Sequence, residues 1–263
     1  MQDEAETTGR WAWIAGASEG LGCAFAEVLA ERGYDLVLFA RREPLLQEIA
    51  ERLRREHGRE VVPVALDLAT DDLVARLEEQ LDARPVHLAV YNAAYAPLGP
   101  FLEQECADVE RALQVNVTGL LRWSHTLGRA MARQGRGGLL LMSSLAGNQG
   151  SHDLATYAGT KGFINIFGES LYSEFAPQGV DVLICCAGAI RTPGLAAVTS
   201  KEAPGTLDAR TVAEQALDRL ARGPRFVPGW INAFAALLLG RWLPRRWAIE
   251  LMRRASSDVG APS

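Results

Sequence analysis

Short apolar runs alternate with segments of helical periodicity from residue 11 almost to residue 228. Runs such as WAWIAG, DLVLFA and VDVLICCAG are apolar throughout, which is typical of strands buried on both faces of a parallel sheet. The segments between them are long enough to serve as helical crossovers, so the pattern predicts a series of βαβ units. We therefore expect an α/β fold with a doubly wound parallel sheet of about seven strands and helices on both faces.

No linker, repeat or shift of composition interrupts this alternation, which predicts a single domain over residues 1–263. Hydrophobic residues make up 48% of the chain and charged residues 22%, as in soluble globular proteins with a sizeable core. The net charge of -5 gives no reason to expect a nucleic-acid partner. Residues 1–9 are polar and acidic and contain no secretory signal, and we expect them to be flexible.

The four cysteines are not spaced like a metal site, so we expect no bound metal. Cys185 and Cys186 are adjacent within an apolar run, where free cysteine behaves as a small hydrophobic residue. We therefore expect reduced thiols and a cytoplasmic location.

A glycine-rich stretch, AGASEGLG, follows the first apolar run and precedes the first helical segment. It places Gly16, Gly20 and Gly22 where a strand-to-helix turn brings bare backbone N–H groups to the amino terminus of a helix. Glycines also serve ordinary tight turns, but the context of strand, loop and helix favours a site for the phosphates of a dinucleotide.

The segment YAGTK places Tyr157 and Lys161 four residues apart at the start of a long helical segment. Such positions share one face of a helix, and a nearby ammonium favours the ionised form of a phenol. We therefore expect Lys161 to lower the pKa of Tyr157, which makes this tyrosine a candidate proton donor or acceptor. A chance pair on the surface is the alternative.

Two further polar residues are candidates for a functional role. Ser144 ends the apolar run GGLLLMSS, and Asn116 lies inside a long helical segment although asparagine lowers helix propensity. Each also has a structural alternative, Ser144 as a cap at a strand end and Asn116 as a satisfied core amide.

The glycine loop followed by these four polar residues in this order resembles the short-chain dehydrogenases/reductases, in their single-domain type with a YxxxK active site. The resemblance covers about Trp11 to Val227. The usual opening T-G-x-x-x-G-x-G is matched except that Ala15 replaces the threonine. The resemblance implies a Rossmann-type fold and a catalytic set made of Asn116, Ser144, Tyr157 and Lys161.

The resemblance also implies a role for each member of this set. The hydroxyls of Ser144 and Tyr157 would hydrogen-bond the substrate carbonyl oxygen, and Tyr157 would deliver the proton. Lys161 would hold the nicotinamide ribose in addition to tuning the tyrosine. Asn116 would anchor a water that links Lys161 to solvent.

The second apolar run ends in FARRE, with Ala40, Arg41 and Arg42. Many dinucleotide folds have an acidic residue here for the ribose 2′-OH. Because the strand end has no carboxylate and offers two guanidiniums, the pattern predicts NADP(H) rather than NAD(H). A solvated charge pair at the start of a helix is the alternative.

Further cofactor contacts are implied by the resemblance at three strand ends. Asp67 in LDLA is expected at the adenine with the Leu68 backbone beside it, and small residues in YNAA let the adenine ribose lie close. The family motif P-G-x-x-x-T is AGAIRT in this chain, so Ala187 replaces the proline. The full set of expected cofactor-binding residues is Gly16, Ser18, Glu19, Gly20, Leu21, Gly22, Arg41, Arg42, Asp67, Leu68, Asn92, Ala93, Tyr157, Lys161, Gly188, Ile190 and Thr192.

Residues 229–263 differ in character, with an apolar core too short to span a bilayer, three tryptophans and several arginines. We expect a helical extension of two short helices broken near Pro244. It would act as a lid or subunit interface over an apolar substrate, and an amphipathic segment on an anionic membrane surface is the alternative. Similar tails occur in relatives resembling 3-ketoacyl and steroid-type reductases, which favours a lipophilic ketone as substrate.

These observations predict an NADPH-dependent carbonyl reductase that converts an apolar or acyl ketone into a secondary alcohol. The same site run as an alcohol dehydrogenase is one alternative. A dinucleotide-binding sensor or scaffold without turnover is another. By analogy with the family we expect a homodimer or homotetramer.

Overall fold

The computed structural model describes residues 9–196, 202–238 and 243–256. Residues 1–8 of the segment 1–9 that was predicted to be flexible, and Trp242 in the tail, lie outside the described residues. Seven strands form one sheet in the order β3-β2-β1-β4-β5-β6-β9, and every neighbouring pair is parallel. The strands are β1 Trp11–Ala15, β2 Asp35–Ala40, β3 Val61–Ala65, β4 Leu88–Tyr91, β5 Gly137–Ser144, β6 Val180–Ala187 and β9 Arg225–Phe226.

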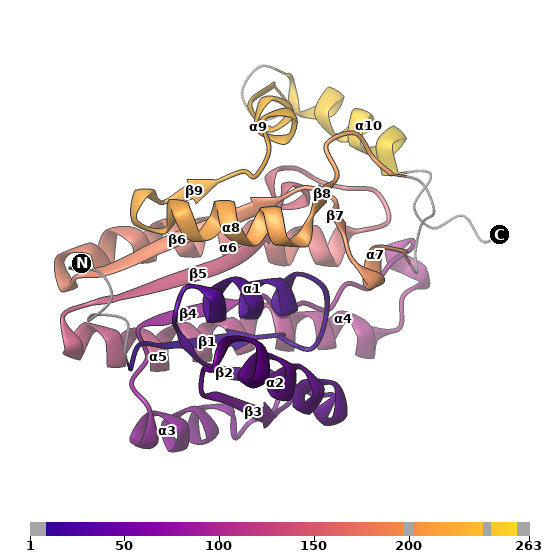
Figure 1. Cartoon of the computed structure of the whole chain (residues 1–263). Coiled ribbons are helices and arrows are strands. Elements are labelled where there is room, and N and C mark those ends of the chain that lie inside the picture. Colours follow the sequence, from indigo (N-terminus) through magenta and orange to yellow (C-terminus); the bar gives the residue numbers. More distant parts are fainter. Residues whose placement is uncertain (1–8, 197–201, 239–242, 257–263) are drawn as a thin grey trace.

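Helices cover both faces of this sheet (Figure 1). One face packs against α1 Gly20–Glu31, α2 Glu43–His57 and α8 Ala209–Arg219. The other face packs against α3 Leu73–Ala83, α5 Leu120–Gln134 and α6 Ala155–Phe175. The fold is therefore of the Rossmann type, as the alternation of apolar runs and helical segments predicted.

The central strands are almost completely buried, which explains why their sequences are apolar without alternation. All five residues of β1 are buried, and so are the last five of β2. Strand order reverses between β1 and β4, because the chain proceeds to β2 and β3 on one side and to β5 and β6 on the other. The carboxyl ends of the strands at such a switch point form the crevice where ligands bind in open α/β sheets.

The long helical segment expected around Asn116 is present but is not uniform. α4 (Cys106–Leu113) and α5 are joined by a π-helical turn over Gln114–Gly119. A π-turn frees a backbone carbonyl from the regular ladder, and such turns are frequent at functional sites. The buried Tyr91 hydroxyl donates to the Val115 carbonyl in this turn at 2.6 Å.

A second, two-stranded sheet was not foreseen from the sequence. It pairs β7 (Ile190–Arg191) with β8 (Leu207–Asp208), and a short helix, α7 (Pro193–Ala196), follows β7. Strands of two residues leave no periodic signal in a sequence.

The tail forms two helices, α9 (Trp230–Leu237) and α10 (Arg245–Ser256), as expected. Figure 1 shows them together beyond the β9 edge of the large sheet. Over the described ranges, the search for a helix with the length and apolar character needed to cross a bilayer found none.

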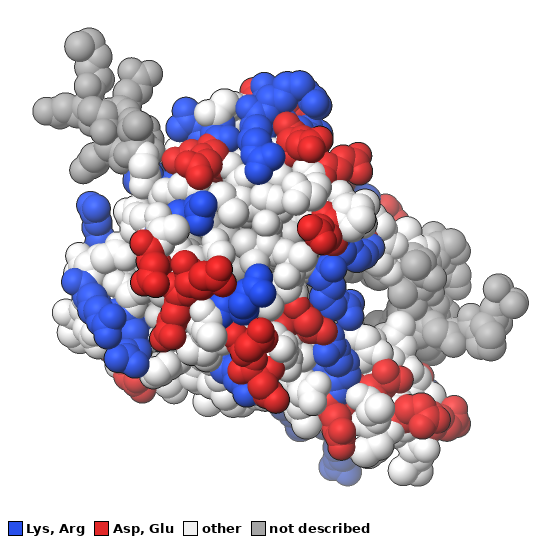
Figure 2. Space-filling model, turned by 90° about the horizontal axis from the view of Figure 1, so that it is seen from below, with Lys and Arg blue, Asp and Glu red and all other residues white. Residues whose placement is uncertain are grey.

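Acidic and basic side chains are interspersed over the face shown in Figure 2. Many arginines of the protein lie next to a carboxylate, for example Arg52 beside Glu27 at 2.5 Å and Arg122 beside Asp71 at 3.1 Å. Basic groups on this face are thus mixed with acidic ones instead of forming one large cationic area.

Candidate active site

The glycine-rich loop lies against the segment that follows β4. Gly16 has a φ of 81° and donates its N–H to the Phe39 carbonyl at 2.8 Å. A Cβ at this position would lie 2.8 Å from the Cα of Ala93, so only glycine fits. Asn92 Nδ2 donates to the Gly16 carbonyl at 3.0 Å and locks the turn. The loop therefore delivers the amino terminus of α1 to the strand ends, where backbone N–H groups can receive phosphates.

A cavity of about 470 Å³ opens beside this loop, between the carboxyl ends of β1, β2, β3 and β4. It brings together many of the residues predicted to bind the cofactor, from motifs spread over the chain. Its lining consists of Gly16, Ser18, Glu19, Gly20, Leu21, Ala40, Arg41, Arg42, Leu66, Asp67, Leu68, Asn92, Ala93, Ala94, Tyr95, Arg111, Val115, Thr192 and Gly194.

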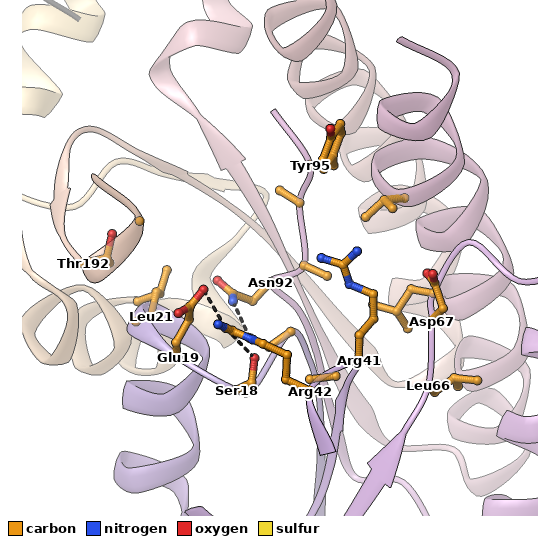
Figure 3. Close-up of a pocket in the computed structure, with 18 of the residues that line it drawn as sticks. Ser18, Glu19, Leu21, Arg41, Arg42, Leu66, Asp67, Asn92, Tyr95 and Thr192 are labelled. Carbon is orange, nitrogen blue, oxygen red and sulfur yellow. Dashed lines mark hydrogen bonds and ion pairs between the residues drawn. The ribbon is translucent and has the colours of Figure 1, made fainter. Parts of the chain in front are cut away.

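The two arginines after β2 differ in their surroundings. Arg42 Nη2 donates to Ser18 Oγ at 3.1 Å and lies 2.7 Å from Glu19 Oε1. Arg41 extends into the cavity (Figure 3), and within the described part of the chain its guanidinium has no hydrogen-bonding partner. The strand end itself has no carboxylate, but the fold brings Glu19 from the glycine loop to Arg42. Arg41 is thus available to an anion, whereas Arg42 is already paired.

Asp67 lies at the far wall of the cavity and is held by an arginine that sequence reasoning missed. Arg111 Nη2, from α4, donates to Asp67 Oδ2 at 2.6 Å, and the Ala69 N–H donates to Asp67 Oδ1 at 3.0 Å. Burial acts to raise the pKa of the Asp67 carboxyl, but the hydrogen bonds from Ala69 and Arg111 outweigh it, so this pKa lies below its usual value. Asp67 and Arg111 are 44 residues apart, and no local pattern signals their contact.

Tyr95 is a second residue of the cavity wall that the sequence did not single out. Its hydroxyl donates to Asp108 Oδ1 at 2.5 Å. Its backbone is held by Asn116, whose Oδ1 accepts from the Tyr95 N–H at 2.7 Å and whose Nδ2 donates to the Tyr95 carbonyl at 2.8 Å. The remaining Nδ2 hydrogen goes to Thr160 Oγ1 at 3.0 Å. Both amide hydrogens of Asn116 are thus used within the protein, and its expected contact with a water stays a prediction.

Ser144, Tyr157 and Lys161 come together from β5 and the first turns of α6. Ser144 is the last residue of β5, and its hydroxyl interacts with the Tyr157 phenol through a hydrogen bond. Lys161 Nζ lies 5.4 Å from the centroid of the Tyr157 ring and donates to the Met142 carbonyl at 2.8 Å. Lys161 is only 2% exposed, whereas Tyr157 is partly accessible. The helix thus presents a phenol backed by a buried ammonium, with a second hydroxyl at hand.

The expectation that Lys161 lowers the pKa of Tyr157 is wrong for the cofactor-free protein. Burial raises the pKa of the Tyr157 phenol, and the hydrogen bond with Ser144 opposes this rise only in part. Burial also lowers the pKa of Lys161 to about 8. The Lys161 ammonium lies 5.4 Å from the ring centroid and donates to the Met142 carbonyl instead of to the phenol oxygen. Burial is therefore the largest influence on the pKa of the Tyr157 phenol.

The remaining predicted residues divide between the cavity and its surroundings. Thr192 lines the cavity, and Ile190 lies in β7. Gly22 and Gly188 are packed against protein: a Cβ on Gly22 would run into the Gly16 carbonyl, and one on Gly188 would lie 2.9 Å from the Asn232 side chain. Asn116, Ser144, Tyr157 and Lys161 do not line the cavity, which covers the part of the site formed by the glycine loop and the ends of β2 to β4.

A doubly wound sheet with a glycine loop at its switch point defines a nucleotide-binding α/β protein. The serine that ends β5, with the tyrosine and lysine of α6 beside it, matches the active-site pattern of one family of such proteins. The chain belongs to the short chain dehydrogenase family, whose model matches residues 10–203. This family binds nicotinamide dinucleotides.

Two curated relatives illustrate the range of the family. A very-long-chain 3-oxoacyl-CoA reductase from Podospora anserina is 35% identical over 179 residues, which cover 66% of this chain and 53% of the relative. This chain thus spans about half the length of the fungal relatives. A 7beta-hydroxysteroid dehydrogenase from Clostridium sardiniense is 30% identical over 188 residues, which cover 72% of each chain.

Solved structures resemble the chain over most of its length. A 7beta-hydroxysteroid dehydrogenase structure has a TM-score of 0.88 at 25% identity and covers 95% of this chain and 99% of its own. A short-chain dehydrogenase from Sphingobium yanoikuyae, in complex with NADPH, has a TM-score of 0.78 at 29% identity and covers 85% and 89%.

Proposed function

We propose that the chain is an NADPH-dependent carbonyl reductase that converts an apolar or acyl ketone into a secondary alcohol, with Tyr157 as the general acid. The observation that carries this proposal is the group formed by the Tyr157 phenol, the Ser144 hydroxyl bonded to it and Lys161 Nζ 5.4 Å from the ring centroid. A carbonyl oxygen placed between the two hydroxyls would accept hydrogen bonds from both.

The residues of the chain fit the phosphate and adenosine parts of a bound dinucleotide. Gly16 has no room for a side chain against Ala93, and the Arg41 guanidinium extends into the cavity without a hydrogen bond to any described residue. The glycine loop and α1 would hold the phosphates, and Asp67 with Leu68 would lie at the adenine. When bound, the nicotinamide supplies the hydride for the carbonyl carbon.

The proton chemistry belongs to the chain itself. Ser144 orients and polarises the carbonyl oxygen, and Tyr157 Oη transfers its proton to that oxygen as negative charge develops there. Because Lys161 Nζ is fixed by the Met142 carbonyl, its other hydrogens are free to hold the ribose hydroxyls next to the nicotinamide. Asn116 stiffens the cavity wall through Tyr95 and would contribute a remaining lone pair to a water.

The raised pKa of Tyr157 fits the protonation state from which reduction starts. A phenol with a raised pKa keeps its proton at neutral pH and is ready to donate it to an alkoxide. Alcohol oxidation needs the phenolate instead, which burial disfavours. The direction inside a cell also depends on the ratio of the cofactor forms.

NADPH is proposed over NADH because of Arg41. A 2′-phosphate next to this guanidinium would form charge-assisted hydrogen bonds, and Arg42 would add to them after releasing Glu19. The Sphingobium relative, which is in complex with NADPH, supports the same choice.

An apolar or acyl ketone is proposed because the relatives include reductases of long-chain 3-oxoacyl-CoA and dehydrogenases of hydroxysteroids. A structural neighbour is specific for bulky-bulky ketones. The single-domain organisation, the homo-oligomer, the cytoplasmic location and peripheral membrane contact of the tail remain predictions. So does a non-catalytic sensor or scaffold, the alternative to turnover.

The proposal is tested by mixing the purified protein with NADPH and a panel of steroid, acyl and small ketones while following NADPH oxidation. We expect turnover of bulky apolar ketones, slower turnover of small ones, and weak activity with NADH. The variant Tyr157→Phe should lose turnover while it still binds NADPH. Binding of NADPH without turnover of any ketone would favour the sensor, and no binding of either dinucleotide would overturn the proposal.

A further inference from the structure

Asn232 is a buried polar residue in the first turn of α9, on a helix whose other side chains are mostly exposed. It is 5% exposed, whereas Trp230 on the same helix is 81% exposed. Its Nδ2 donates to the Gly205 carbonyl at 2.9 Å and to the Pro228 carbonyl at 3.1 Å. Two backbone segments are therefore tied to α9 by one amide.

Glycines leave the space that this amide occupies. A Cβ on Gly188 would lie 2.9 Å from the Asn232 Cγ, Nδ2 and Oδ1 atoms alike, so the amide lies close over the Gly188 backbone. A Cβ on Gly205 would lie 2.5 Å from Oδ1, and Gly205 has a φ of 85°. Both glycines allow a closer approach than any other residue would permit.

The segments that meet at Asn232 lead directly to the site. Gly188 joins β6 to β7, which is followed by Thr192 in the cavity wall. Gly205 precedes β8, whose Leu207 N–H donates to the Ala189 carbonyl at 3.1 Å. Asn232 thus joins α9 to the segments that lead into both strands of the two-stranded sheet, at the end of the site expected to hold the nicotinamide.

The second tail helix contacts the loop that separates Ser144 from Tyr157. Arg245 Nη1 in α10 donates to the Asn148 carbonyl at 2.8 Å. A Cβ on Gly150 would be 3.7 Å from the side chain of Ile249, which is van der Waals distance. Ala248, between these two contacts, is completely buried. The two tail helices therefore rest on the loops on both sides of the proposed proton donor.

We propose that Asn232 is a positioning residue that locks the loop after β6 against the tail, so that α9 and α10 form a fixed wall at the nicotinamide end of the site. The inference deepens the proposed function and rests on it for the identity of the ligand. The exposed apolar groups of α9 lie on the face that turns away from this amide.

The first test compares two ligands on wild type and Asn232→Ala. Under the proposed function NADPH would extend to Gly188, whereas adenosine 2′,5′-bisphosphate would occupy only the adenosine end. Loss of the two hydrogen bonds should weaken NADPH roughly tenfold and leave the bisphosphate within about twofold, as read by titration calorimetry. Equal binding of NADPH by both proteins would overturn the proposal, and so would an equal loss for both ligands, which indicates general destabilisation.

Hydrogen exchange tests the lock without any ligand. In Asn232→Ala, amides of residues 186–192 and 202–208 should exchange at least about tenfold faster, while those of α1 and α2 stay unchanged. The neighbouring exposed Ala233 provides a control, since Ala233→Ser should leave exchange at the wild-type rate. Unchanged exchange in both segments would refute the lock, whether or not the wild type reduces any ketone.

A double-mutant cycle guards against a variant that merely folds poorly. Gly188→Ala places a methyl group against the Asn232 amide and should weaken NADPH about tenfold, whereas Gly188→Ala with Asn232→Ala has room for it. We expect the double variant to bind NADPH more tightly than the sum of the single losses predicts. Additive losses would contradict direct packing of the two residues. Asn232→Asp, which keeps the volume but removes both donors, should reproduce the loss of Asn232→Ala.

Discussion

The adenosine end of the site and its catalytic end are built differently. The adenosine end is an open cavity of about 470 Å³, and the Arg41 guanidinium that extends into it has no hydrogen-bonding partner among the residues that the structure describes. At the catalytic end, Asn116 is completely buried and Lys161 is 2% exposed, and both donate hydrogen bonds within the protein.

At the adenosine end, hydrogen bonds from Ala69 and the Arg111 cation lower the pKa of Asp67. At the catalytic end, burial raises the pKa of Tyr157 although the Lys161 cation lies near its ring.

The largest effect is expected from removing one hydroxyl at the catalytic end. Tyr157→Phe deletes the proton donor and should lower kcat about 10²- to 10⁴-fold while NADPH affinity changes little. Tyr172→Phe, on the same helix α6, should leave kcat unchanged. Undiminished ketone reduction by Tyr157→Phe would show that another group supplies the proton.

The next effect concerns the buried ammonium. In the folded protein the pKa of Lys161 is about 8, below the ordinary 10.5, so the unfolded chain binds more protons between these values. The cofactor-free protein should therefore gain stability as the pH rises from 8 to 10.5, by up to about 3 kcal/mol.

Denaturant titrations of wild type and Lys161→Met at a series of pH values check this. Lys161→Met should lack this rise in the free energy of unfolding. The wild type should therefore gain stability relative to Lys161→Met as the pH rises from 8 to 10.5. Parallel stability curves for the two proteins would mean that burial does not control the charge of Lys161.

At the adenosine end a smaller but selective effect is expected. Arg41→Ala should weaken NADPH about 10- to 100-fold, because charge-assisted hydrogen bonds to the 2′-phosphate are lost, and should leave NADH nearly unchanged. Arg42→Ala should cost less, since this arginine is already paired with Glu19. Fluorescence titrations with both dinucleotides measure the ratio. An equal loss of NADH affinity would assign Arg41 to a part of the cofactor that both forms share.

The smallest effect should come from Glu19→Gln. The variant removes a carboxylate that competes for Arg42 in an ion pair whose side chains are both about half exposed. NADPH should bind a few-fold more tightly, with NADH unaffected, in the same titrations. Weaker NADPH binding would indicate that Glu19 supports the phosphate loop more than it competes with a phosphate.

The sheet was predictable because its signals are local. Unbroken apolar runs such as those of β2 and β6 are typical of strands that are covered by helices on both faces of a parallel sheet. The structure places both strands in such a sheet. The two-residue strands β7 and β8 carry too few residues for such a signal. The π-turn around Asn116 was also not predicted, and the Tyr91 hydroxyl that donates to its Val115 carbonyl comes from 24 residues away.

The candidate site was predictable where residues act through motifs. The glycine loop and the arginines after β2 lie within contiguous stretches, and the structure assembles them around one cavity. Arg111 on Asp67, and Asn232 on Gly188, come from contacts between distant segments that leave no trace in either segment alone. The pKa of Tyr157 was predicted with the wrong sign because helical spacing shows that a cation is near but not how deeply the phenol is buried.

A crystal structure of the protein with NADPH and a non-reactive ketone analogue tests the central claim most directly. The account predicts the 2′-phosphate on the Arg41 guanidinium and the analogue oxygen within hydrogen-bonding reach of both Ser144 Oγ and Tyr157 Oη, beside the nicotinamide. A nicotinamide ring bound away from Tyr157, or an analogue oxygen that meets neither hydroxyl, would contradict it.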